Sequence, residues 1–233
     1  MIKELEALPH LRDKRGMFIG VEANIGAGKT ECAHMLARVR STHGSPTLVF
    51  FEPLEGRFSE LLELYYTDPK RWGFTFQMHC LQARFKQHTL AAELVQNGYH
   101  IVQDRTIYAD GCFGTTVRED GNISDMEWGI YADTFGTLKR YLRYPDLIVY
   151  LRCDPAICYE RMKRRNRSAE AGVPLEYLRR IHAKHEDLIE VMSHYTRVLR
   201  VDWDEFRDVE QLSEQIDVAL DEERTFVKDW NRL

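Results

Sequence analysis

Short apolar runs alternate with longer amphipathic segments along this chain, and the alternation restricts its fold more than any other feature. Five runs have the length of strands and are rich in Val, Ile, Leu or Phe, as in parallel strands buried on both faces: 17–21, 47–51, 100–102, 147–151 and the weaker 197–201. Strands that alternate with helices predict right-handed crossovers and one parallel sheet, an α/β fold. No internal repeat or long linker interrupts the pattern, so we expect a single domain over residues 1–233.

The segment 22–30 reads Glu-Ala-Asn-Ile-Gly-Ala-Gly-Lys-Thr and follows the first predicted strand. It has the spacing of a Walker A phosphate loop, G-x-x-x-x-G-K-[ST], with Ala23 in place of the first glycine. In such a loop backbone N–H groups bind phosphate oxygens, the lysine reaches the β- and γ-phosphates, and the threonine ligates Mg²⁺. The alternative is a chance glycine-rich turn before a helix. We therefore predict a three-layer fold of the P-loop NTPase type, a phosphate loop over 23–30, and ATP contacts from Asn24, Ile25, Gly26, Ala27, Gly28, Lys29 and Thr30.

Carboxylates stand where two of the predicted strands end. Glu52 follows the second strand, and Asp104 with Arg105 follows the run that starts at His100. Ligands of open parallel sheets bind beyond the carboxyl ends of the strands. A carboxylate there can accept the proton of an attacking hydroxyl or hold Mg²⁺. The alternatives are a solvated acid at position 52 and a local ion pair at 104–105.

Composition excludes several classes of protein. Hydrophobic residues make up 44% and charged residues 30% of the chain, and the net charge is −5, which argues against disorder and against a nucleic-acid partner. Five cysteines form no C-x-x-C pair, as expected of reduced, buried thiols in the cytoplasm. Residues 1–16 lack the apolar segment of a signal peptide, and no apolar run is long enough to cross a membrane.

Further motifs occur in order along the chain: YTDPKRWGFTFQMHCLQAR at 66–84, DRTIYAD at 104–110, RMKRRNR at 161–167 and GVPLEYL at 172–178. Together with the phosphate loop and Glu52-Pro53, they resemble the deoxynucleoside kinases, which include deoxycytidine, deoxyguanosine and bacterial deoxyadenosine kinases. The resemblance covers most of the chain. It implies transfer of the γ-phosphate of ATP to the 5′-hydroxyl of a deoxynucleoside, with Mg²⁺, by a homodimer packed through helices.

The resemblance also implies roles for individual residues. Glu52 would be the general base, Arg105 would stabilise the transferring phosphoryl group, and Asp104 would hold Mg²⁺ with Thr30. The nucleoside would contact Glu52 and Arg105 together with Tyr66 and Glu170 at the 3′-hydroxyl, Gln77 at the base edge, and the base-reading pair Arg84 and Asp110. A lid over about 161–171 would bring its arginines to ATP, and an adenine-binding loop would follow the last strand: Arg161, Arg165, Arg167, Glu205 and Phe206.

Spacing supports part of this assignment. Gln77 and Arg84 share one helix face, about 10 Å apart along the axis, beside an apolar stripe. Polar groups that flank a buried stripe can give a ligand pocket its specificity. Arg161 and Arg165 also share a face. The alternatives are a solvated boundary pair on the first helix and a solvated basic face on the second.

Two positions depart from the family pattern. The tryptophan common five residues after the catalytic glutamate is Arg57 here, followed by Phe58, and the aromatic common four residues after the base-reading aspartate is Gly114, preceded by Phe113. The Arg84–Asp110 pair is typical of members that accept deoxyadenosine, deoxyguanosine or deoxycytidine, and the Tyr66 segment resembles the bacterial purine kinases. We therefore predict a purine preference, with deoxyadenosine first and deoxycytidine as a further substrate.

Two other functions fit parts of the sequence. A nucleoside monophosphate kinase would need extra cations for the phosphate of its acceptor, and Arg57 is a candidate. A base at Glu52 argues against it, because a monophosphate is already an ionised nucleophile. A non-catalytic structural member of the fold could lose Lys29, Glu52 or Arg105, yet all three are present.

Overall fold

A five-stranded parallel sheet forms the centre of the molecule, as the sequence predicts. The computed structural model describes residues 15–42, 46–52, 56–167, 170 and 172–222. The strands lie in the order β2-β3-β1-β4-β5, and every neighbouring pair is parallel. Their bounds are β1 Phe18–Ala23, β2 Thr47–Phe50, β3 His100–Asp104, β4 Leu147–Arg152 and β5 Arg197–Asp202. The central strand is β1, and the phosphate loop follows it directly.

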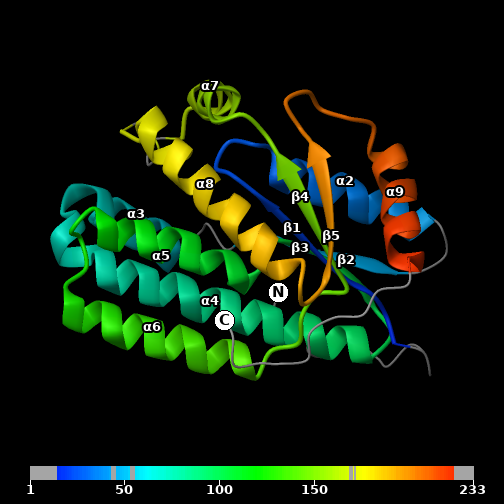
Figure 1. Ribbon diagram of the computed structural model, residues 1–233, viewed down its shortest axis with the longest axis horizontal. Coiled ribbons are helices and arrows are strands. Elements are labelled where there is room, and N and C mark those ends of the chain that lie inside the picture. Colours follow the sequence, from blue (N-terminus) through cyan, green and yellow to red (C-terminus); the bar gives the residue numbers. More distant parts are fainter. Residues whose placement is uncertain (1–14, 43–45, 53–55, 168–169, 171, 223–233) are drawn as a thin grey trace.

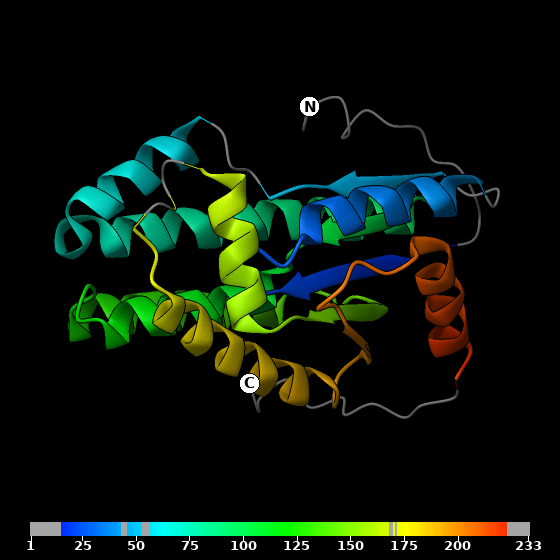
Figure 2. The same ribbon diagram turned by 90° about the horizontal axis from the view of Figure 1, so that it is seen from above.

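Helices cover both faces of this sheet and complete the three predicted layers (Figure 1). On one face α2 and α9 pack against the strands and against each other. On the other face α4 and α8 pack against the strands, with α6 packed outside α4. Figure 2 shows α7 beyond the arrowhead of β1. The helix bounds are α2 Lys29–Thr42, α3 Arg57–Thr67, α4 Pro69–Gln96, α5 Asp110–Glu119, α6 Asp125–Arg140, α7 Pro155–Arg165, α8 Leu175–Met192 and α9 Val209–Asp221, with a 3₁₀ turn at Ile107–Ala109.

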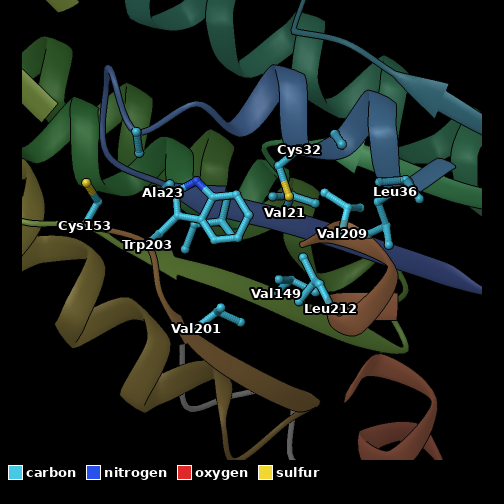
Figure 3. Packing of buried hydrophobic residues seen from close by; sticks show 14 of the residues in the cluster. Val21, Ala23, Cys32, Leu36, Val149, Cys153, Val201, Trp203, Val209 and Leu212 are labelled. Carbon is cyan, nitrogen blue, oxygen red and sulfur yellow. The ribbon is translucent and has the colours of Figure 1, made fainter. Parts of the chain in front are cut away.

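The core consists of apolar side chains that alternate between the two faces of each central strand. Val21 and Val149 point to the layer of α2 and α9, where Leu36 and Leu212 meet them (Figure 3), whereas Ile148 packs on the opposite face. Strands buried in this way read as continuous apolar runs, which is why the sequence locates them.

The sequence places the end of the first strand too early, at Val21, whereas β1 runs on to Ala23. The reason is Glu22, a charged residue that lies fully buried in the strand. Its Oε1 accepts hydrogen bonds from the backbone N and the hydroxyl of Thr106, at 2.7 and 2.6 Å. Buried carboxylates are tolerated when they are paired in this way, and the partner lies more than eighty residues away.

Two fully buried histidines make stability depend on pH. Burial lowers the pKa of His88 to about 4 and, together with Arg105, that of His185 to about 3. The unfolded chain binds these protons near pH 6.5 and the native protein does not, so the free energy of unfolding should fall as pH drops below about 6.5. We expect about 1.4 kcal/mol per histidine per pH unit, down to about pH 4.

Denaturant unfolding at pH 7.5, 6 and 5 measures this slope. His88→Gln keeps a donor for the carbonyl of Arg143, which His88 Nε2 contacts at 2.7 Å, and should remove one histidine's share. The exposed His194→Gln is the matched control and should leave the slope as it is. A slope unchanged in His88→Gln would contradict the assignment.

Candidate active site

A cavity lies beyond the carboxyl ends of β1, β2 and β3, where the sequence predicts the ligands. Its walls come from the phosphate loop, the segment after β2, α3, α4, the segment after β3, α5, the predicted lid and α8. Its described lining residues are Ile25, Gly26, Lys29, Thr30, Glu52, Phe58, Leu62, Tyr65, Tyr66, Phe76, Gln77, Cys80, Arg84, Arg105, Phe113, Arg165, Arg167, Glu170 and Tyr177. Charged and polar side chains therefore share this cavity with aromatic and aliphatic ones.

The phosphate loop has the backbone that its glycines predict. Gly26 and Gly28 adopt positive φ angles of 80° and 95°, and a Cβ on Gly26 would lie 2.2 Å from the carbonyl oxygen of Cys158. Ala23 ends β1 fully buried. It is not among the described non-glycine residues with positive φ. Alanine therefore fits where the loop pattern has its first glycine.

Two further loop residues tie it to its surroundings. The Asn24 side chain donates to the carbonyl oxygen of Leu178 in α8 at 2.8 Å and accepts from the N–H of Ile25, while Ala27 is fully buried. These contacts hold the loop, which lies between β1 and α2, against α8.

Lys29, Thr30 and Asp104 meet at the phosphate end of the cavity. The Thr30 hydroxyl donates to Asp104 Oδ2 at 2.5 Å, and Lys29 Nζ lies 3.7 Å from Asp104 Oδ1. Burial and the nearby Arg105 lower the pKa of Lys29. Asp104 Oδ1 is buried and has no hydrogen-bond partner in the described part of the chain. A hydroxyl and a carboxylate side by side are oxygen ligands of the kind Mg²⁺ uses together with phosphates and water.

Glu52 faces two arginines. Its Oε1 accepts from Arg84 Nη2 at 2.5 Å and lies 3.6 Å from Arg105 Nε. Burial by itself raises the pKa of this carboxyl, but Arg84, Arg105 and Lys29 outweigh burial and lower the pKa to about 2. The residue is thus ionised at neutral pH and available as a proton acceptor.

The backbone at Arg105 makes a sharp left-handed turn, with φ at 66°. Residues other than glycine rarely adopt this conformation unless their surroundings impose it. Here Arg105 N–H donates to the carbonyl of Val21 at 3.0 Å, and its own carbonyl accepts from Gln103 Nε2 at 3.1 Å. The bonds from Thr106 to Glu22 hold the next residue, so the turn is fixed on both sides.

This turn sends the buried Arg105 guanidinium into the cavity. Nη2 donates to the carbonyl of Ala23 at 3.2 Å, and the group lies 4.6 Å from the centre of the Phe113 ring. Nη1 lies 3.1 Å from His185 Nε2, while His185 Nδ1 lies 2.8 Å from the carbonyl of Ile181. Because a carbonyl only accepts, Nδ1 carries the proton and Nε2 accepts from Arg105.

The sequence motifs predict no role for His185 or Glu22. Each is a polar residue inside a buried pattern, His185 in the apolar stripe of α8 and Glu22 in β1. That placement is the one signal that could have found them, because a buried polar residue needs a partner.

The predicted base-reading pair is formed, although only one member reaches the cavity. Arg84 Nη1 donates to Asp110 Oδ1, and the Tyr131 hydroxyl donates to Asp110 Oδ2 at 2.5 Å. Asp110 is fully buried behind Arg84. Gln77 and Arg84 are both buried and line the cavity. Gln77 Oε1 and Arg84 Nε have no hydrogen-bond partner among the described residues.

The two departures from the family pattern have different structural outcomes. Arg57 is exposed and lines a separate hollow on α3, α4 and α6, whereas the buried Phe58 lines the cavity. Gly114 turns to Tyr131, and a Cβ there would lie 2.6 Å from the tyrosine ring. Phe113 lines the cavity beside it. An aromatic residue adjacent in sequence therefore lines the cavity at each position.

Tyr66 and Glu170, predicted at the 3′-hydroxyl, both line the cavity. Arg165 Nη2 donates to both oxygens of Glu170 at 2.7 Å, and Arg167 Nη1 lies 3.8 Å from the same carboxylate. Arg165 and Arg167 thus reach the cavity, and both pair with Glu170. Lid residues 168, 169 and 171, like Pro53 and both chain ends of the predicted domain, lie outside the described residues.

Arg161 has a different position from the other two lid arginines. It donates to the carbonyl oxygens of Trp203 at 3.0 Å and Asp204 at 2.6 Å, and it stacks over Phe206 at 4.3 Å. Phe206 packs so close to Gly28 that a Cβ on the glycine would lie 2.8 Å from its ring. Glu205, the other residue predicted near adenine, is exposed in the same segment. Arg161 therefore joins α7 to the segment that follows β5.

Comparison with known proteins agrees with this geometry. The model of the deoxynucleoside kinase family matches residues 19–228. A deoxyadenosine kinase of Dictyostelium discoideum is 37% identical over 201 residues, covering 86% of this chain and 78% of that protein. A probable deoxycytidine kinase of fowlpox virus is 37% identical over 72% of this chain and 69% of its own length. Deoxycytidine kinase 2 of Gallus gallus is 33% identical over 84% and 80%. The chain is a phosphotransferase that belongs to the deoxynucleoside kinase family.

Proposed function

We propose that this kinase transfers the γ-phosphate of ATP to the 5′-hydroxyl of purine deoxynucleosides, deoxyadenosine first, with deoxycytidine as a further substrate. The observation that carries the proposal is the position of Glu52. Its ionised carboxylate lies in one cavity with the phosphate-loop Lys29 and the base-end Arg84. A hydroxyl acceptor needs such a base, whereas a monophosphate does not.

The residues proposed to contact the nucleobase support the proposed preference for deoxyadenosine and deoxycytidine. The buried Arg84 Nε–H is a free donor and Gln77 Oε1 a free acceptor among the described residues. Adenine and cytosine each present a ring nitrogen acceptor beside an amino donor, which complements this pair. The negative charge of Asp110 behind Arg84 favours an amino group over a carbonyl oxygen. The named activity of the Dictyostelium discoideum relative, a deoxyadenosine kinase, points the same way.

Mg²⁺ is part of the proposal. Thr30 and Asp104 would hold it, with the partner-free Asp104 Oδ1 as the available carboxylate oxygen. The ion would neutralise charge on the β- and γ-phosphates. Lys29 and Arg105 supply the protein's own cations at the same end, and Arg165 and Arg167 approach from the lid side.

We also propose a cytoplasmic homodimer. Along α6 and just after it, apolar side chains remain exposed at Met126, Ile130 and Tyr141, as expected of a helix that packs on a second copy. The five cysteines are buried and unpaired, which suits a reducing compartment. Among the described residues, no helix combines the length and apolar character needed to span a membrane.

The test is ATP-dependent phosphorylation of the four common deoxynucleosides and of their monophosphates, with Mg²⁺ and with excess EDTA. Turnover of deoxyadenosine that requires Mg²⁺ is the expected result. Turnover of monophosphates alone would replace the proposal with a monophosphate kinase, and absence of all turnover would favour the non-catalytic alternative. Arg57 is exposed and is not among the described residues that line the cavity, so it gives an acceptor phosphate less support than the sequence suggested.

Removing the base-reading pair should broaden the substrate range. In a double variant, Arg84→Met with Asp110→Ala, we expect the ratio of kcat/KM for deoxyadenosine over thymidine to fall about 10²-fold, because a site built on charged hydrogen bonds discriminates through them. The matched control is the exposed ion pair Arg118–Asp125, changed in the same way. A double variant with the parent's substrate ratios would exclude the pair from base recognition.

A further inference from the structure

Tyr131 lies in the middle of α6 and meets the base-reading pair from behind. Its side chain is 1% exposed, and its ring stacks between Trp128 and Phe135, with ring centres 5.4 and 6.1 Å away. Packing on both sides leaves the ring little freedom. Its hydroxyl, the one polar atom of the side chain, donates to Asp110 Oδ2 at 2.5 Å.

Gly114 makes this approach possible. It lies in α5, one helical turn after Asp110, and a Cβ at this position would come within 2.6 Å of the Tyr131 hydroxyl oxygen. Glycine inside a helix costs roughly 1 kcal/mol relative to alanine. The Tyr131 side chain occupies the space that a larger residue at position 114 would take.

The hydroxyl completes the bonding of a fully buried carboxylate. Asp110 Oδ1 accepts from Arg84 Nη1, and Arg84 Nη2 continues to Glu52 Oε1 at 2.5 Å. Three hydrogen bonds therefore connect α6 to the predicted general base. Burial raises the pKa of Asp110, and the bonds from Arg84 and Tyr131 oppose that rise. Without the tyrosine, the buried Oδ2 would lose its donor, which is costly for a charged group.

We propose that Tyr131 is a positioning residue that fixes Asp110, and through it the plane of Arg84, and thereby sets which base the kinase accepts. The inference rests on the proposed base recognition by Arg84. With both Asp110 oxygens committed, the guanidinium keeps one orientation, and its free Nε–H faces a base from a fixed direction. Without this restraint the Arg84 guanidinium can rotate and also bind the carbonyl-bearing edge of another nucleobase, so discrimination between nucleobases declines.

The experiment compares Tyr131→Phe with Tyr108→Phe. Both changes delete only a hydroxyl from a buried ring, but the Tyr108 hydroxyl has no hydrogen-bond partner in the described structure. We expect kcat/KM for the preferred deoxynucleoside to fall about tenfold in Tyr131→Phe, mainly through KM, as for loss of a hydrogen bond to a charged group. The ratio of best to poorest substrate should fall with it, and Tyr108→Phe should keep both values. Gly114→Ala, which displaces the tyrosine from the other side, should shift the ratio in the same direction.

Two results would overturn the role of Tyr131. One is an equal loss for all four deoxynucleosides with a lower melting temperature, which is what damage to packing alone produces. The other is an unchanged ratio in Tyr131→Phe. A wild-type enzyme that prefers a base other than adenine would overturn the proposed preference alone, because its own best-to-poorest ratio still tests the tyrosine.

Discussion

Glu52→Gln is expected to lower kcat by a factor on the order of 10² to 10⁴, the usual contribution of a general base. The amide has the shape of the carboxylate, and its oxygen can still accept from Arg84, so the KM of the nucleoside should change little. Steady-state kinetics with the preferred deoxynucleoside separate the two parameters. The exposed Glu63→Gln on α3 is the matched control. Full turnover by Glu52→Gln would assign the proton to another acceptor.

The pH dependence of kcat and kcat/KM tests the role of Glu52 in a second way. Burial raises the pKa of Glu52, and three cations lower it to about 2, so the acid limb of kcat/KM should lie well below pH 5. Bound phosphates neutralise Lys29 and Arg105, which weakens the lowering, and the acid limb of kcat should therefore lie at higher pH. Arg84→Met should move both limbs upward. If the acid limbs of kcat and kcat/KM stay at the same pH in this variant, Arg84 does not set the pKa of Glu52.

Arg105→Lys is expected to lower kcat by a factor on the order of 10² to 10³, as for loss of a transition-state donor. Lysine keeps the charge and meets the same positive φ, so backbone strain and net charge are matched. It lacks the planar fork that contacts the carbonyl of Ala23 and His185 at once while stacking on Phe113. The nucleoside KM should change less than kcat.

Arg105→Ala should in addition destabilise the fold by about 3–5 kcal/mol, because it leaves Glu22 buried without its cation. Arg105 Nη1 lies 3.7 Å from Glu22 Oε2. Denaturant unfolding measures this loss, and the exposed Arg152→Lys and Arg152→Ala serve as controls. Wild-type turnover by Arg105→Lys would mean that a point charge suffices at this position.

The strands could be predicted because their signal is local. Five apolar runs predict the five strands, and the strand-loop-helix context of residues 23–30 identifies the phosphate loop. The same holds for Gln77 and Arg84, whose spacing puts them on one face of α4. Each of these inferences needs a short window of sequence and the geometry of one element.

The features that could not be predicted from the sequence depend on partners far away in the chain. Glu22 belongs to β1 only because Thr106 and Arg105 receive its carboxylate. Tyr131 reaches Asp110 because α6 packs on α4 and Gly114 leaves room, and neither fact is visible in a linear pattern. Arg57 could have faced the nucleoside or the outside. The rotation of α3 about its axis decides which way Arg57 points. Consecutive helical residues point about 100° apart, and Phe58 takes the inner side.

The two ends of the cavity are built from different parts of the chain. The groups proposed to face phosphate come from the loop after β1 and from the predicted lid, whereas the groups proposed to face the base come from α3, α4 and α5, with α6 behind them. Arg84 nevertheless joins the two ends, because it contacts both Asp110 and Glu52. A substitution that reshapes the proposed nucleobase end through Arg84 would therefore also change the surroundings of the predicted general base, whereas one that leaves Arg84 in place need not.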